Sequence, residues 1–280
     1  MLQLLRYATY GVVMTVALVV VSATALAQAP QPRTPPGTTM RPAGKTAAKP
    51  TIVLVHGAFA DGSSWDKVVP LLLAKGYPVV AVHEPMVSAA EDIDATKRAI
   101  DAAPGPVILV GHSYGGFVIT EAGMNDKVIG LVYVAAFAPD AEQSINDVGK
   151  AVPPPAWQKT AIIDKAGFAT LRTDDVMKNF AQDLPAADQR LIAVKQAPIP
   201  LKSFDVRITQ PAWKSKPSWY VRAANDRMID PGLQTSMATK IRATTKTLQS
   251  SHVPMLSQPR QVADVILQAA EGAPSATAQR

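Results

Sequence analysis

The chain has 280 residues, of which 48% are hydrophobic and 18% charged, and it contains 24 prolines, 16 glycines and no cysteine. The missing thiols exclude disulfide bonds, thiolate metal sites and cysteine nucleophiles, so stability must come from packing. The formal net charge of +6 is small, and the sequence has no run of basic residues of the kind that contacts a phosphate backbone. We therefore expect no nucleic acid partner.

The first 27 residues are predicted to be a secretory signal peptide. No charged residue occurs from Ala8 to Ala27, Arg6 precedes this stretch, and Ala25-Leu26-Ala27 has the small-residue pattern that signal peptidase cleaves. An uncleaved membrane anchor through residues 8–27 is the alternative, because about 20 apolar residues can just span a bilayer. We therefore expect an exported protein, periplasmic or secreted, without stable membrane insertion once the signal is removed.

Both ends of the remaining chain are expected to be flexible. Residues 28–50 hold six prolines and show no apolar periodicity, which predicts a spacer rather than folded structure. A short tail is expected at residues 273–280. The predicted folded domain therefore covers residues 51–272, a normal size for one α/β domain.

Short apolar runs recur after the spacer and predict a parallel sheet. Most of them are apolar on both faces, as is typical of strands that helices cover on both sides. Segments with helical spacing or helix-start signals separate them. This alternation predicts an α/β protein with a mostly parallel, doubly wound sheet. The predicted strands are 51–56, 78–83, 106–111, 129–135, 218–223 and 244–249, and the predicted helices are 64–74, 92–102, 114–124, 231–242 and 259–270.

One long stretch interrupts the alternation. Residues 139–216 separate the fourth predicted strand from the fifth, and a structureless loop of that length is improbable inside a compact domain. Helix-like pieces around Ile162, around Val176 and at residues 188–196 predict an inserted helical cap over the carboxyl ends of the strands, where ligands bind in open α/β folds. Most large apolar cap residues pack a cap onto its sheet. We nevertheless propose Trp157 and Phe180, with Phe59, as pocket residues.

A nucleophile is predicted at Ser113. The segment Gly111-His112-Ser113-Tyr114-Gly115 matches G-x-S-x-G between a predicted strand and a predicted helix, where a tight turn needs glycines. Such a turn exposes the serine hydroxyl at the top of the sheet, and the helix that follows directs backbone N–H groups toward it. The side chain of His112 is expected to point away, into the turn.

A serine hydroxyl needs a base to take its proton, and His252 is the candidate. It lies in the loop between the last predicted strand and the last helix, which opens at the carboxyl edge of the sheet. The carboxylate that orients the imidazole is expected after the fifth strand, where Asp226 and Asp230 are available. Because Asp230 directly precedes Pro231 and resembles a helix N-cap, the role is assigned to Asp226.

Two backbone N–H groups are predicted to bind an oxyanion. Gly57 follows the first strand and allows the backbone to turn, so that the Ala58 N–H faces the site. The N–H of Tyr114, directly after the nucleophile, is the second donor. No metal or cofactor is expected, because the histidines lack H-E-x-x-H spacing and no phosphate-loop or dinucleotide motif is present.

Over residues 51–270 the chain resembles the α/β-hydrolase superfamily, whose triads follow the chain order of Ser113, Asp226 and His252. Within it, the chain is most similar to the branch of plant methyl-ester esterases, hydroxynitrile lyases and bacterial carboxylesterases. The lyases have a threonine where Gly57 stands and a lysine where Val253 stands, so the resemblance implies ester hydrolysis. The motifs that carry the resemblance are His56-Gly57-Ala58-Phe59, Gly111-His112-Ser113-Tyr114-Gly115-Gly116 and the segment Ser251 to Ser257.

The sequence thus predicts a serine carboxylesterase that acts through an acyl-enzyme on a small or medium, mostly apolar ester. Amide or lactone hydrolysis, a lyase step and cofactor-free perhydrolase chemistry are alternatives on the same triad. A non-catalytic protein that uses the fold as a ligand pocket is another. A small-molecule ester is the expected partner, and no pattern in the sequence encodes the oligomeric state or a role for the mild positive charge.

Overall fold

A computed structural model describes residues 49–273. The predicted signal peptide, the spacer up to residue 48 and the tail from residue 274 lie outside these residues. None of the helices within 49–273 combines the length and the apolar character needed to cross a bilayer.

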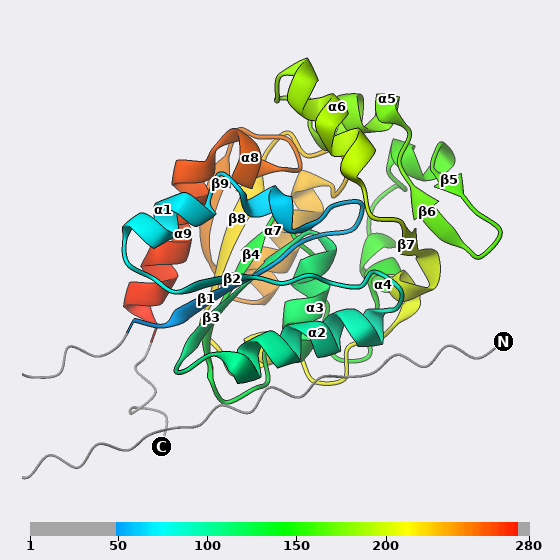
Figure 1. The fold of residues 1–280 in the computed structure, drawn as a ribbon. Coiled ribbons are helices and arrows are strands. Elements are labelled where there is room, and N and C mark those ends of the chain that lie inside the picture. Colours follow the sequence, from blue (N-terminus) through cyan, green and yellow to red (C-terminus); the bar gives the residue numbers. More distant parts are fainter. Residues whose placement is uncertain (1–48, 274–280) are drawn as a thin grey trace, which may run out of the picture. The chain divides into compact units, whose positions relative to one another are not determined.

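Six parallel strands form the central sheet in the order β2-β1-β3-β4-β8-β9 (Figure 1). The strands β1, β3 and β4 are buried along their whole length, which explains why they are apolar on both faces. The strand order reverses direction between β1 and β3, and ligands bind at such a switch point. All six predicted strands are confirmed, with the bounds β1 (Thr51–Val55), β2 (Val79–Ala81), β3 (Val107–His112), β4 (Val128–Val134), β8 (Ser218–Ala223) and β9 (Thr244–Leu248).

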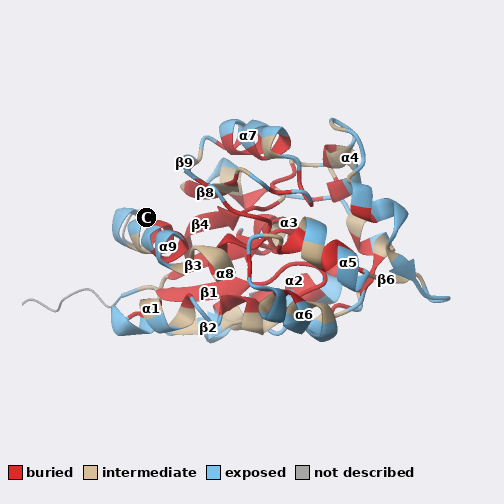
Figure 2. Ribbon diagram, turned by 90° about the horizontal axis from the view of Figure 1, so that it is seen from above, coloured by how far each residue is buried: buried red, intermediate tan, exposed pale blue. Residues whose placement is uncertain are grey.

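Helices cover both faces of the sheet, and buried residues concentrate in the strands between them (Figure 2). Ser88 caps the second predicted helix through a 3.2 Å bond from the Glu91 N–H to its hydroxyl. The predicted helix 64–74 is instead divided into a 3₁₀ turn, η1 (Gly62–Trp65), and a helix that has Pro70 in its first turn. The helices of the core are α1 (Val69–Ala74), α2 (Ala89–Ala102), α3 (Tyr114–Ala122), α7 (Pro231–Lys240), α8 (Pro254–Ser257) and α9 (Pro259–Gly272).

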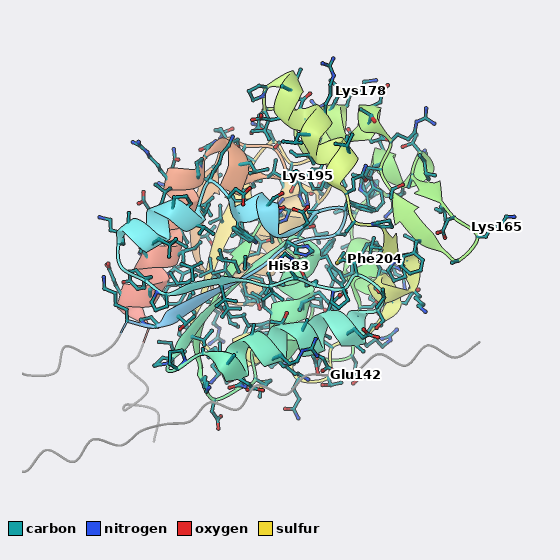
Figure 3. All side chains as sticks on the ribbon, in the orientation of Figure 1. His83, Glu142, Lys165, Lys178, Lys195 and Phe204 are labelled. Carbon is teal, nitrogen blue, oxygen red and sulfur yellow. The ribbon has the colours of Figure 1, made fainter. Side chains whose placement is uncertain are left out.

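The stretch between β4 and β8 is only partly helical. Helices form around Val176 and at α6 as predicted, but the helical prediction around Ile162 is wrong, because this residue lies in a strand of a three-stranded antiparallel sheet. Gly167, with φ of 84°, closes the hairpin whose tip carries Lys165 (Figure 3). The elements between β4 and β8 are α4 (Ile145–Gly149), η2 (Ala156–Lys159), β5 (Ile162–Ile163), β6 (Phe168–Thr170), α5 (Thr173–Asp175), the π-helix η3 (Val176–Phe180), α6 (Ala186–Lys195), β7 (Ile199–Pro200), η4 (Leu201–Asp205) and η5 (Ala212–Lys214).

Candidate active site

Ser113 occupies a strained turn between β3 and α3. Its φ of 53° lies in the left-handed region that residues other than glycine rarely adopt. Its carbonyl oxygen accepts hydrogen bonds from the N–H groups of Gly116 at 3.0 Å and Phe137 at 3.1 Å, which hold the turn. A Cβ on Gly115 would lie 2.4 Å from the carbonyl oxygen of His56, so the turn can close against β1 only with glycine there.

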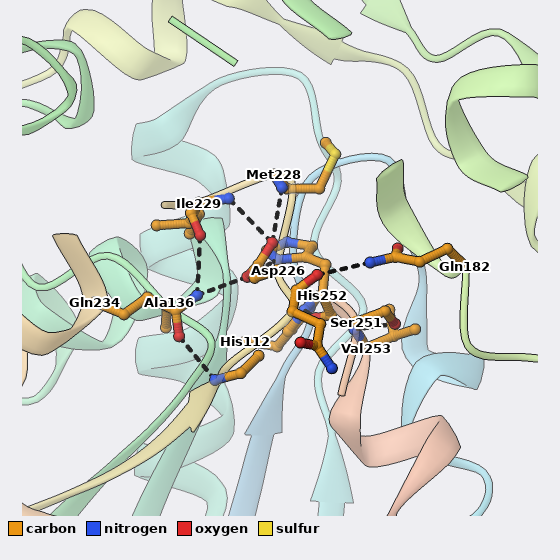
Figure 4. A network of polar contacts seen from close by, with 12 residues as sticks. His112, Ala136, Gln182, Asp226, Met228, Ile229, Gln234, Ser251, His252 and Val253 are labelled. Atoms are coloured by element: carbon orange, nitrogen blue, oxygen red, sulfur yellow. Dashed lines mark hydrogen bonds and ion pairs between the residues drawn. The ribbon is translucent and has the colours of Figure 1, made fainter. Parts of the chain in front are cut away.

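His252 and Asp226 meet at the ends of neighbouring strands. His252 follows β9, Asp226 follows β8, and the imidazole Nδ1 lies 2.7 Å from carboxylate Oδ2 with both side chains buried (Figure 4). The other oxygen, Oδ1, accepts backbone N–H bonds from Met228 at 2.7 Å and Ile229 at 3.1 Å. An ionised carboxylate only accepts hydrogen bonds, so Nδ1 carries the proton and Nε2 is left as an acceptor.

Asp230, the alternative carboxylate, serves the helix instead. Its Oδ1 accepts N–H bonds from Gly232 at 2.7 Å and Leu233 at 3.0 Å, which makes it the N-cap of α7 as predicted. Of the two aspartates, Asp226 is therefore the one in contact with His252.

Gln234, which the sequence analysis missed, supports the carboxylate from α7. Its fully buried side-chain amide donates to Asp226 Oδ2 at 2.7 Å and to the Ile229 carbonyl at 3.1 Å (Figure 4). Its oxygen accepts the Ala223 N–H at 3.0 Å. Every polar atom of this amide group thus has a partner, which fixes the orientation of the glutamine. The only signal in the sequence was a polar residue on a helix face that packs on the sheet.

The side chain of His112 was expected to point into the turn, but it does not. β3 extends through His112, which pairs with Val134, so its side chain projects from a strand. Its Nε2 lies 2.8 Å from the backbone carbonyl oxygen of His252, and the two rings are 4.7 Å apart. Burial, together with the nearby His252, lowers the pKa of His112 well below its ordinary value. The neutral ring donates from Nε2 to that carbonyl and holds the loop that carries His252.

The backbone after β1 lies against the nucleophile. A Cβ on Gly57 would approach the Ser113 Cβ to 2.8 Å and the His112 ring to 2.9 Å. Ala58 and Tyr114, whose N–H groups are the predicted oxyanion donors, line the same cavity as Ser113. Within residues 49–273 neither N–H donates to a protein acceptor.

One cavity of about 590 Å³ is lined by all eight residues that the sequence analysis predicted for the site. Three of them, Phe59, Trp157 and Phe180, supply aromatic walls, and the rings of Phe59 and Trp157 meet edge to face at 5.5 Å. Further apolar walls come from residues that no motif in the sequence indicates, of which Ile145 and Leu233 are examples. Within the part of the chain that the structure describes, no group of three or more His, Asp or Glu residues is placed to hold a metal ion.

The cap holds both loops that carry the candidate base and the carboxylate that orients it. The Phe180 ring, at the end of the π-helix, packs edge to face on His252 at 5.1 Å. Gln182 donates to the carbonyl oxygen of Asn225 at 2.7 Å, and Asp183 Oδ2 accepts the Ser251 N–H at 2.8 Å. Segments far apart in the sequence therefore fix the residues next to Asp226 and His252.

Replacing Asp183 with alanine is expected to lower kcat about tenfold, because the hydrogen bond that holds the His252 loop to the cap is lost. Asp183→Asn keeps an acceptor oxygen for the Ser251 N–H, so most of the activity should remain. The measurement is kcat and KM for one short-chain ester. Equal activity of the alanine and wild-type proteins would show that the cap does not position this loop.

A buried acid–base pair lies beneath the backbone turn after β1. His56 Nδ1 lies 3.3 Å from Glu84 Oε2 and 3.0 Å from the Gly57 carbonyl oxygen. Burial, together with the neighbouring Asp92, raises the pKa of Glu84 well above its ordinary value, and burial lowers the pKa of His56. Asp92 in turn accepts a 2.8 Å hydrogen bond from the Tyr114 hydroxyl. The pair therefore favours uncharged forms next to the predicted oxyanion donors.

The free energy of unfolding of Glu84→Gln, relative to that of the wild-type protein, is expected to increase as the pH rises. The unfolded chain ionises Glu84 near the ordinary value of 4.5, whereas the folded chain keeps the proton to higher pH. The folded state then binds more protons, so wild-type stability falls with rising pH in that window. Urea unfolding at about pH 5 and about pH 8 measures the effect. The exposed Glu91→Gln is the control, and an equal shift in both variants would contradict the prediction.

Comparison with known proteins places the chain among hydrolases. A family described as "Alpha/beta hydrolase family" matches residues 52–265. Methylesterase 1 of Arabidopsis thaliana is 28% identical over 258 residues, covering 80% of this chain and 97% of that protein. A pyrethroid hydrolase of Sphingobium wenxiniae is 26% identical over 247 residues, covering 77% and 85%. The crystal structure of polyneuridine aldehyde esterase has a TM-score of 0.69 at 20% identity, covers 79% of this chain and 98% of its own, and is similar in fold.

Proposed function

Because the chain belongs to the alpha/beta hydrolase family, we propose that it is a serine carboxylesterase with Ser113, His252 and Asp226 as its catalytic triad. The observation that carries the proposal is the buried 2.7 Å contact between His252 and Asp226, beside the same cavity as the strained Ser113 turn. A base that a carboxylate orients, lining one cavity with a serine, provides the groups that acyl transfer needs.

The proposed reaction has two halves. Ser113 Oγ attacks the ester carbonyl carbon while His252 Nε2 takes the hydroxyl proton, and the N–H groups of Ala58 and Tyr114 bind the oxyanion. The tetrahedral intermediate collapses, the C–O bond to the alcohol breaks, and His252 gives its proton to the departing oxygen. Water then attacks the acyl-enzyme with the same proton transfers and releases the carboxylic acid and the free serine.

We propose a small or medium, mostly apolar ester as the substrate. The cavity of about 590 Å³ falls within the range of small-molecule sites, and aromatic and aliphatic side chains make up most of its walls. Relatives named methylesterase and pyrethroid hydrolase support ester hydrolysis as the reaction.

The test is turnover of p-nitrophenyl butyrate by the purified protein, combined with labelling by a fluorophosphonate. We expect hydrolysis, loss of hydrolysis after labelling, and a single label on the peptide that contains Ser113. A protein that neither turns over the ester nor takes the label is not a serine esterase. Hydrolysis with the label on another residue would show that this other residue, and not Ser113, is the nucleophile.

A further inference from the structure

A second cavity, of about 150 Å³, lies beside the catalytic one, and Phe59 and Phe180 line both. We refer to it as the side cavity. Its other walls come from the first turn after β1, from the cap helix α6 and from α8. The apolar residues that line it besides the two phenylalanines are Ala60, Leu184, Leu191, Ile192, Val253 and Leu256. The side cavity therefore shares two aromatic walls with the catalytic cavity, and apolar residues make up just over half of its lining.

The rim of the side cavity is polar and is held by exposed contacts. Lys67 Nζ lies 3.3 Å from Asp188 Oδ2, and Lys195 Nζ donates to Ser63 Oγ at 3.2 Å, so both lysines link α6 to the η1 region (Figure 3 labels Lys195). Exposed ion pairs of this kind contribute little to stability. These exposed contacts therefore contribute little to holding α6 against the η1 region.

The side cavity is lined by two residues next to His252, the base that must face the leaving group. In acyl transfer the general acid gives its proton to the departing oxygen, so the alcohol portion of an ester lies next to the histidine. Val253, which follows His252 directly, lines the side cavity, and Phe180 packs on the His252 ring. Ser113, Tyr114 and His252 line only the catalytic cavity, so the side cavity can take only a group that extends past Phe180 from the reacting ester.

We propose that the side cavity binds the alcohol portion of the substrate, so that the acyl portion stays in the larger cavity. The proposal rests on the esterase function proposed above. A cavity of about 150 Å³ with apolar walls is large enough for benzene. The preferred substrates are therefore esters of benzyl alcohol or of primary alcohols with a short alkyl group of similar volume, in preference to methyl esters.

The test compares benzyl butyrate with methyl butyrate, which share one acyl group. Burial of a phenyl group is expected to raise kcat/KM for the benzyl ester about ten- to a hundredfold over the methyl ester in the wild-type protein. Ile192→Trp on α6 and Leu256→Trp on α8 fill the side cavity, and each is expected to bring this ratio close to one. Val194→Trp, on the exposed face of α6 and outside the cavity, is the matched control and should keep the wild-type ratio.

A second pair of measurements separates the alcohol side from the acyl side. Ile192→Ala enlarges the cavity and is expected to raise kcat/KM for naphthylmethyl butyrate relative to benzyl butyrate, a gain that a folding defect cannot produce. The order of kcat/KM among methyl acetate, butyrate and hexanoate should be the same in wild type and Ile192→Trp. A changed acyl order with an unchanged benzyl preference would overturn the proposal. Wild type without benzyl preference would also overturn it, whereas absence of all ester hydrolysis would instead refute the proposed function.

Discussion

Ser113→Ala is expected to lower kcat for p-nitrophenyl butyrate by about 10⁴- to 10⁶-fold, the range found when the nucleophile of a serine triad is removed. Without Oγ no acyl-enzyme can form, and His252 has no hydroxyl to deprotonate. Any remaining rate must come from water held near the predicted oxyanion donors, Ala58 and Tyr114. Fluorophosphonate labelling should be lost together with the activity.

The fold should survive this substitution. Alanine carries the same Cβ as serine, so the left-handed backbone at position 113 is no more strained than in the wild-type protein. We expect the thermal midpoint to change by no more than a few degrees. Ser218→Ala, at a buried serine of β8 that lines neither cavity, is the control and should keep full activity. More than a tenth of wild-type activity in Ser113→Ala would exclude Ser113 as the nucleophile.

The sequence predicts the central sheet well because a parallel strand that is covered on both faces has a local signature. Every residue of β1 and β4 is buried, so composition alone identifies these strands. The Ser113 turn is equally local, since five consecutive residues specify it. Asp226 and His252 required one more step, the rule that loops after parallel strands meet at one edge of the sheet.

The features that the sequence did not reveal depend on long-range packing. Gln234 and His112 act through hydrogen bonds to residues that only the fold brings near them. The cap strand β5 has two residues, too few for an alternating pattern, and its exposed isoleucines do not distinguish a strand from a helix. The contact of Asp183 with Ser251 spans 68 positions along the chain. None of these partners follows from periodicity or from a motif.

Asp226→Asn is expected to lower kcat by about 10³- to 10⁴-fold, because the substitution forces the wrong tautomer on His252. The amide oxygen of an asparagine must face the N–H groups of Met228 and Ile229, which only donate. Its NH₂ group then faces His252 Nδ1 and the amide nitrogen of Gln234, both of which are donors in the wild-type protein. His252 can accept from that NH₂ only by moving its proton to Nε2.

A proton on Nε2 removes the acceptor that Ser113 needs, so the loss falls on kcat rather than on KM. Gln234 cannot relieve the conflict by turning over, because its oxygen already accepts the Ala223 N–H. The variant should also lose about 1–3 kcal/mol of unfolding free energy, since two buried donors face each other. Asp230→Asn is the matched control: asparagine caps a helix as well as aspartate does, so α7 and most of the activity should remain. If Asp230→Asn lost activity and Asp226→Asn kept it, the two carboxylates would have the opposite roles.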